Sequence, residues 1–155
     1  MTGLNALKAE VQYESQADNL PSQQQFSQWL LRCFPNQVDE TVLIRLVDIP
    51  ESTALNEQYR GKSGPTNILS FPFDVPEHVP NQHLGDLVIC APIVCSEATA
   101  QGKPLTDHWA HLLVHGVLHL LGYDHITEPD AREMEALEVK LLQNIGISDP
   151  YRDFV

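Results

Sequence analysis

The segment from Leu105 to Leu121 limits the possible folds most, because it is the most apolar stretch of helical length in this chain. Apolar residues on nearly every side of a helix must be covered by other parts of the protein. Gly122 follows directly and can adopt the left-handed backbone conformation in which helices commonly end. The sequence therefore predicts a helix over Leu105–Leu121 that ends at Gly122 and lies against the rest of the fold.

Periodicity elsewhere predicts further strands and helices in mixed order. Alternating or β-branched segments predict strands at Leu7–Tyr13, Thr41–Val47, Asn67–Phe73 and Gly85–Cys90. Helical spacing predicts helices at Pro21–Phe34, Ile49–Tyr59, Pro92–Gln101 and Glu128–Ile145. Pro72 indicates an edge strand or a strand end, and two prolines indicate a loop over Val75–His83. Without an internal repeat or a linker, residues 1–155 are expected to form one small α+β domain.

The charge balance is strongly acidic, with nine Lys and Arg residues against 21 Asp and Glu residues and a formal net charge of −12. Such a field repels polyanions at long range. Nonspecific coating of nucleic acid is therefore not expected, and any nucleic-acid partner must be held by a local basic patch.

Signals for export or membrane insertion are missing from the sequence. No apolar run approaches the ~20 residues that span a bilayer, and the first residues lack the basic region and apolar core of a signal peptide. The three cysteines match neither a C-x-x-C motif nor a secreted disulfide framework. We expect a cytoplasmic protein with reduced thiols and no membrane contact.

Three histidines near the end of the apolar segment have the spacing of a metal site. His115 and His119 are four residues apart, which places them ~40° apart around a helix and ~6 Å apart along it. The turn at Gly122 then allows His125 to approach the same point. Three imidazoles leave one position of a tetrahedral zinc ion open, as in catalytic sites. The pattern predicts one zinc ion per chain, held by His115, His119 and His125, although nickel, copper or iron could take the same ligands in vitro.

Residues around this motif leave several roles open. Gly116 stands where a zinc protease carries its general-base glutamate, so peptide hydrolysis would lack its base. His108 and His111 extend the row of histidines and are interpreted as surface residues or as partners of the metal ligands. Asp124 is either a turn residue or a carboxylate that handles protons.

Arg60 and Lys62 form the densest basic point of the chain, within the sequence Arg-Gly-Lys-Ser-Gly-Pro-Thr. A guanidinium among glycines and hydroxyl groups suits phosphate binding through side-chain and backbone N–H groups. Two basic residues in a loop are more often simply solvated. Taken alone, this segment favours solvation over a phosphate site.

Three stretches together resemble the YbeY family of zinc-dependent endoribonucleases in their order and separation. They are LNEQYRGKSGPTNILSFPF, GDLVIC and HGVLHLLGYDH, within a region of similarity from about Val47 to Tyr151. The resemblance implies a short mixed sheet packed with helices, with a zinc site on a helix of the C-terminal half, as in metalloproteases. It also implies that His115, His119 and His125 bind zinc and that Arg60 is functionally important. Many relatives carry aspartate where this chain has Asn67.

The resemblance implies a single-strand-specific endoribonuclease that acts in ribosomal RNA maturation and ribosome quality control. Its expected partners are ribosomal RNA and, in addition, proteins of the small ribosomal subunit or assembly GTPases. We expect zinc to act as the Lewis acid and Arg60 to clamp the phosphate. The proton carrier stays open, with Asp124 as one candidate, as does the nucleophile, water or the RNA 2′-hydroxyl. The alternatives are a non-catalytic, zinc-stabilised ribosome assembly factor and a metalloprotease-like hydrolase.

Overall fold

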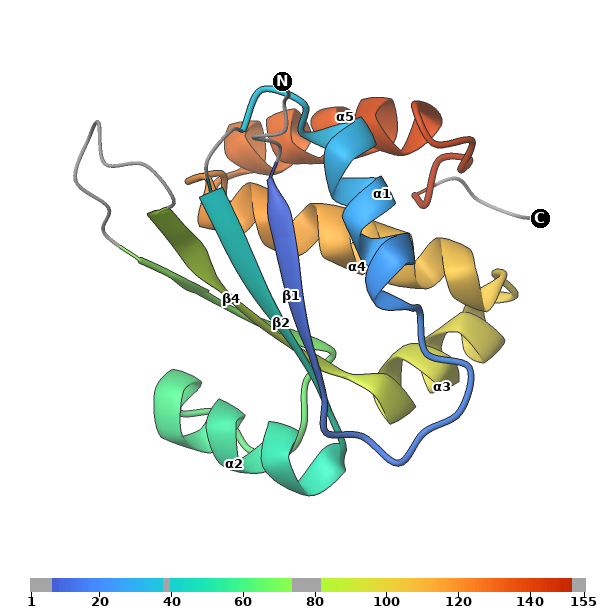
Figure 1. Cartoon of the computed structure of the whole chain (residues 1–155). Coiled ribbons are helices and arrows are strands. Elements are labelled where there is room, and N and C mark those ends of the chain that lie inside the picture. The colour runs from blue at the N-terminus through green and yellow to red at the C-terminus, as the bar shows by residue number, and fades with distance from the viewer. Residues whose placement is uncertain (1–6, 38–39, 74–81, 152–155) are drawn as a thin grey trace.

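The computed structural model describes residues 7–37, 40–73 and 82–151 and has a four-stranded mixed sheet at its centre (Figure 1). The strand order is β1-β2-β4-β3. The strands are β1 Lys8–Tyr13, β2 Glu40–Val47, β3 Ile68–Pro72 and β4 Gln82–Cys90. β1, β2 and β4 run parallel, and β3 pairs antiparallel with β4 at one edge of the sheet. The α+β class is thereby confirmed, as is the edge position that Pro72 indicated.

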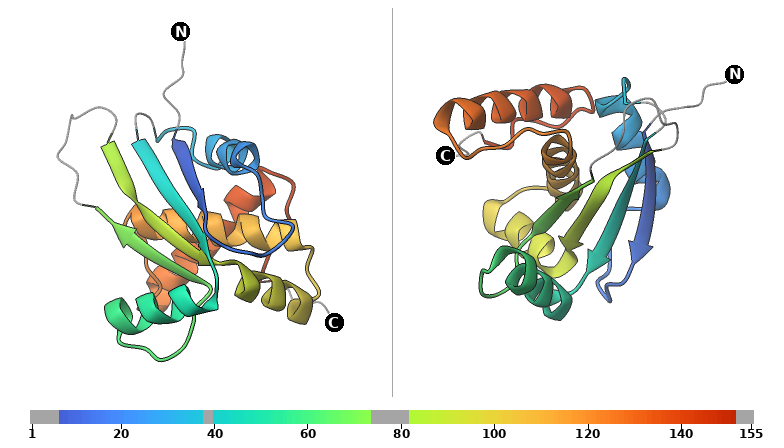
Figure 2. Two further views of the ribbon diagram at one scale, coloured as in Figure 1. Left: turned by 60° about the horizontal axis from the view of Figure 1, so that its bottom comes forward. Right: turned by 90° about the vertical axis from the view of Figure 1, so that its left-hand side faces the viewer.

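Helices cover both faces of the sheet. They are α1 Gln23–Cys33, α2 Ile49–Arg60, α3 Ala91–Gln101, α4 Leu105–Leu120 and α5 Glu128–Gln143. Leu87 and Ile89 of β4 point into the main core with α4, whereas Val88 points to the opposite face, where Leu55 of α2 packs. The right-hand view of Figure 2 shows α5 lying over α4, which in turn lies on the sheet. No helix within the described ranges is long and apolar enough to cross a membrane.

Helix α4 is the centre of the main core, as its apolar sequence predicts. Ten of its 16 residues are buried. Trp109 is 2% exposed and meets Phe26 of α1 edge to face, with ring centroids 6.1 Å apart. Aromatic pairs in this arrangement add to the free energy of burial by about 0.5–1.5 kcal/mol. α4 is thus held by α1, α5 and the sheet, which fixes the direction of the side chains on its remaining face.

Two glycines allow α4 to lie close to the sheet. A Cβ at Gly116 would lie 2.7 Å from Cδ1 of Ile68 and 2.8 Å from Cδ2 of Leu87. A Cβ at Gly85 would lie 2.6 Å from both Cδ2 of Leu120 and the backbone oxygen of Phe71. Such distances are too short for real contacts. Gly116 therefore serves the packing of α4 on β3 and β4, at the position where a zinc protease has its glutamate.

Most predicted boundaries differ from the observed ones by one to three residues, and two of these differences have a clear physical reason. The first helix begins at Gln23 and not at Pro21, because the Ser22 side chain accepts a hydrogen bond from the Gln25 N–H and caps the helix. The predicted loop over Val75–His83 was wrong for its last two residues. Gln82 and His83 belong to β4 and pair with Glu40 and Thr41 of β2, and the earlier part lies outside the described residues.

Candidate metal centre

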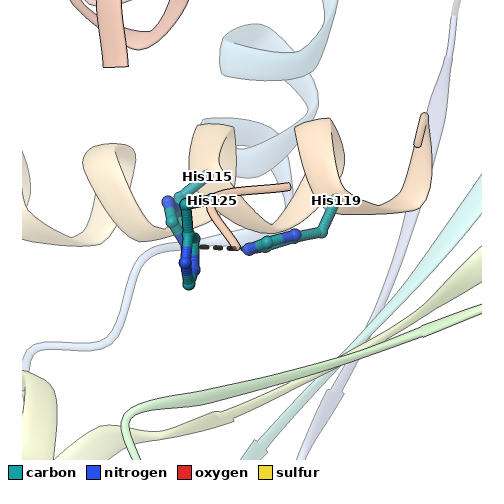
Figure 3. A group of neighbouring side chains, drawn as sticks. All are labelled: His115, His119 and His125. Atoms are coloured by element: carbon teal, nitrogen blue, oxygen red, sulfur yellow. Dashed lines mark hydrogen bonds between the residues drawn. The ribbon is translucent and has the colours of Figure 1, made fainter. Parts of the chain in front are cut away.

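The three predicted histidine ligands lie together at the C-terminal end of α4 (Figure 3). His115 and His119 occupy consecutive turns of the helix, and His125 follows the turn at Gly122, whose φ is +103°. One ring nitrogen from each histidine lies within 4.8 Å of the other two. Asp124 accepts a hydrogen bond from the Ile126 N–H at 3.2 Å, which supports its interpretation as a turn residue. The local sequence thus brings three imidazoles to one point.

The hydrogen bonds of two of these rings fix their tautomers. Nδ1 of His115 lies 2.9 Å from Oε1 of Glu138, and Nδ1 of His119 lies 3.0 Å from the backbone oxygen of Tyr123. A carboxylate and a carbonyl only accept hydrogen bonds, so both Nδ1 atoms carry the hydrogen. Burial lowers the pKa of His119, and the neighbouring His115 and His125 lower it further. When the rings are neutral, both Nε2 atoms present lone pairs, the form that binds metal ions.

These two lone pairs face each other. Nε2 of His115 and Nε2 of His119 are 3.1 Å apart, along the dashed line in Figure 3. When both rings are neutral with the hydrogen on Nδ1, neither atom has a proton to donate, and two lone pairs at this distance repel. Zinc–nitrogen bonds of about 2.0–2.1 Å place tetrahedral ligands roughly 3.3 Å apart. The spacing therefore fits two nitrogens that share a cation.

Glu138 is the residue that orients His115. It lies on α5, its carboxylate is completely buried, and it also accepts hydrogen bonds from Nε2 of His111 at 2.9 Å and from the Tyr151 hydroxyl at 2.7 Å. Burial alone would raise the pKa of Glu138, but the hydrogen bonds from His111, His115 and Tyr151 outweigh it and bring the pKa to about 2. An ionised carboxylate behind a ligand imidazole is a common feature of metal sites.

Sequence reasoning missed the role of Glu138. A signal was available, because Met134, Glu138 and Leu142 are spaced four residues apart and all three are buried in α5. A glutamate on the apolar side of a helix requires a partner. Glu138 also forms, with His111 and His115, a second group that could hold a metal ion. In that group the ring nitrogens already have the carboxylate as their hydrogen-bond partner.

His108 is buried and His111 is partly buried, and both contact carboxylates, so the surface interpretation was wrong for His108. Nε2 of His108 lies 2.9 Å from Oε1 of Glu97, which also accepts a hydrogen bond from the Asn67 amide at 3.2 Å. The side chain of His111 is only 12% exposed and contacts Glu138. The alternative interpretation, partners of the metal ligands, fits His111, because it shares Glu138 with His115.

Arg60 is the last residue of α2, and both Arg60 and Lys62 are exposed. Gly61 follows it with a φ of +65° and ends the helix. No hydrogen bond or ion pair joins Arg60 to the three histidines in the part of the chain that the structure describes. The structure thus brings the three predicted ligands together and leaves the predicted arginine on a separate element.

Comparison with known proteins gives a consistent picture. Residues 9–146 match a family described as endoribonuclease YbeY. An endoribonuclease YbeY from Methylococcus capsulatus is 62% identical over 112 residues, which are 72% of this chain and 75% of that protein. The solution structure of a Thermotoga maritima protein superposes with a TM-score of 0.60, covering 93% of this chain and 100% of that one. At 22% identity, this last likeness concerns the fold alone.

Proposed function

The chain belongs to the endoribonuclease YbeY family, and on this premise we propose that it is a zinc-dependent endoribonuclease with its metal ion held by His115, His119 and His125. The observation that carries the proposal is the 3.1 Å separation of two Nε2 atoms whose hydrogens are held elsewhere. Ligands of this kind suit zinc, and the third imidazole leaves room for a substrate oxygen.

The residues of this chain contribute orientation and charge. When bound, zinc supplies a Lewis acid for the negative charge that develops on the phosphoryl oxygens during cleavage. Glu138 and the Tyr123 carbonyl hold the rings of His115 and His119 in the orientation that ligation requires. We assign the phosphate clamp to Arg60, because a guanidinium can donate two parallel hydrogen bonds to one phosphate.

The proposed substrate is single-stranded RNA within ribosomal RNA, and the proposed setting is ribosomal RNA maturation and quality control in the cytoplasm. Proteins of the small ribosomal subunit or assembly GTPases are the proposed protein partners. The net charge of −12 requires that RNA is recognised locally. Exposed Arg60 and Lys62 at the end of α2 provide the local positive charge.

A protease role has less support from the geometry. The position of the protease glutamate is occupied by Gly116, and a side chain there would enter the packing between α4 and the sheet. A carboxylate introduced at this position would displace Ile68 and Leu87 before it reached a substrate. The remaining alternative is an assembly factor in which zinc only stabilises the fold.

Cleavage of a single-stranded RNA oligonucleotide by zinc-loaded protein tests the proposal. We expect internal cleavage, little cleavage of the same strand in a duplex, and loss of activity on chelation. Products with a 2′,3′-cyclic phosphate would identify the 2′-hydroxyl as nucleophile, and 5′-phosphate with 3′-hydroxyl ends would identify water. Casein in place of RNA is the control: its zinc-dependent cleavage would indicate a protease, and no cleavage of either substrate would indicate the assembly factor.

A further inference from the structure

A cleft of about 340 Å³ opens beside His115, on the same side of α4 as the metal centre. It runs from His115 back to His108, seven residues or about 10.5 Å along the helix. Ile68 of β3 and Leu112 of α4 form apolar walls, and Tyr151 borders the cleft near Glu138. The cleft therefore begins at a metal ligand and extends away from it over two helical turns.

The polar part of this cleft is built around Glu97 of α3. Its Oε1 accepts hydrogen bonds from Nε2 of His108 at 2.9 Å and from the Asn67 amide at 3.2 Å, and the same amide nitrogen lies 3.4 Å from Oε2. His108 is 3% exposed, so one of these partners is fixed within the core. A carboxylate offers about four lone-pair positions, and the Glu97 side chain is 32% exposed. Because the Asn67 amide nitrogen spans both oxygens through long hydrogen bonds, a ligand with two adjacent donors can take its place on this firmly held carboxylate.

Lys103 supplies a donor in the same cleft. Lys103 is partly buried, and within the described part of the chain it forms no ion pair with Glu97. The cleft thus presents a fixed acceptor and a separate cationic donor between apolar walls. A phosphate would meet the Glu97 carboxylate, whose charge repels it. A flat, uncharged ligand with hydrogen-bond donors and acceptors on one edge fits these groups better.

We propose that this cleft binds the base of the nucleotide next to the scissile phosphate and that it prefers guanine, an inference that rests on the proposed endoribonuclease function. Guanine has two adjacent donors, N1–H and the N2 amino group, that can pair with one carboxylate, and its O6 can accept from Lys103. Each of the other three bases offers a single donor group on this edge. A volume of about 340 Å³ lies at the small end of ligand sites and suits one nucleoside.

Nucleoside binding to the full-length, metal-free protein tests this proposal without any cleavage. Guanosine, adenosine, cytidine, uridine and ribose 5-phosphate are titrated while ¹H–¹⁵N NMR follows the Asn67 side-chain amide. We expect guanosine to shift this signal and to bind at least about fivefold more tightly than the other nucleosides. Ribose 5-phosphate should leave the signal unchanged.

Glu97→Gln has the same size as wild type and should weaken guanosine binding about tenfold or more, because a charge-assisted pair of hydrogen bonds is lost. Glu10→Gln is the matched control, since Glu10 is exposed on β1 at the other edge of the sheet. If Glu97→Gln lowers the melting temperature, Lys103→Ala takes its place, and it should reduce the preference for guanosine over adenosine.

Equal binding of all four nucleosides, unchanged guanosine binding in Glu97→Gln and Lys103→Ala, or ribose 5-phosphate binding at this cleft would each overturn the inference. The base site and the proposed endoribonuclease function are tested by separate outcomes. Protein that cleaves RNA but does not bind guanosine refutes only the base site. Protein that binds guanosine through Glu97 but never cleaves RNA refutes only the endoribonuclease assignment.

Discussion

Oε1 of Glu138 lies 2.9 Å from Nδ1 of His115, although the two residues are 23 positions apart and belong to different helices. The carboxylate has no solvent exposure. The packing of α5 on α4 therefore sets the orientation of a proposed metal ligand, and the fold and the candidate metal centre are coupled through this contact. A change at Glu138 should accordingly be visible in metal affinity as well as in stability.

Glu138→Gln is expected to weaken zinc binding about 10- to 100-fold, because it removes the charge that holds the Nδ1–H of His115. Competition with a chromogenic zinc chelator measures this affinity. Glu135→Gln is the control, since Glu135 is exposed on the same helix. A variant that binds zinc as tightly as wild type would show that Glu138 does not position the ligand.

The contribution of Glu138 to the stability of the fold should also depend on pH. The pKa of Glu138 is about 2 in the folded protein against an ordinary value of 4.5. Its contribution is therefore complete above pH 4.5 and is lost as the pH falls toward 2. This difference corresponds to about 3 kcal/mol, at about 1.36 kcal/mol per pKa unit. Denaturation of metal-free wild type and Glu138→Gln should give a stability gap that narrows below pH 4.5, and a constant gap would contradict the assignment.

Gly85→Ala is expected to lower the free energy of unfolding by about 1–3 kcal/mol through overpacking. The new methyl group would meet the backbone oxygen of Phe71, which cannot move without shifting β3. Gly116→Ala should cost less, because its Cβ meets only side-chain ends of Ile68 and Leu87 and alanine favours the helix. Urea denaturation of both variants compares them. Equal stability of Gly85→Ala and wild type would mean that both β3 and the Leu120 side chain can shift to make room for the methyl group.

Much of this fold is encoded locally. The apolar segment that forms α4, its end before Gly122 and the position of β3 at the sheet edge all follow from side-chain patterns within a few residues. The start of β4 at Gln82 does not, because it depends on pairing with Glu40 of β2, far away in the sequence. Strand ends that rest on distant partners leave no local pattern.

The candidate metal centre likewise has one part that could be predicted from the local sequence and one part that could not. His115, His119 and His125 could be predicted because one helix and one turn bring them together. The contacts of Glu138 with His115 and of Glu97 with His108 join different helices, and they depend on how those helices pack. The burial of a charged residue on an apolar helix face was the one local sign of such a contact.

Arg60→Glu is expected to abolish RNA cleavage while zinc content and melting temperature stay near wild type, because Arg60 is exposed at the end of α2. Arg60→Lys should be intermediate, since an ammonium keeps the charge but loses the two parallel hydrogen bonds. Loss of such a contact is worth roughly 2–4 kcal/mol, about 30- to 1,000-fold in rate.

Arg32→Glu is the matched control for Arg60, because Arg32 is also exposed in the last turn of a helix, α1. It should cleave RNA at the wild-type rate. If Arg60→Glu also cleaves a short RNA at that rate and fails only to bind a ribosomal partner, Arg60 is a docking residue and not a phosphate clamp.

The rate of RNA cleavage as a function of bound zinc per chain tests the central claim most directly. Metal-free protein is reloaded in steps, and zinc content and cleavage of single-stranded RNA are measured on the same samples. We predict a proportional rise that levels off at one zinc per chain. We also predict that His119→Ala, which loses one of two facing Nε2 atoms, retains little zinc and cleaves at background rate. Full cleavage by metal-free protein, or stoichiometric zinc in a His115→Ala/His119→Ala variant, would contradict it.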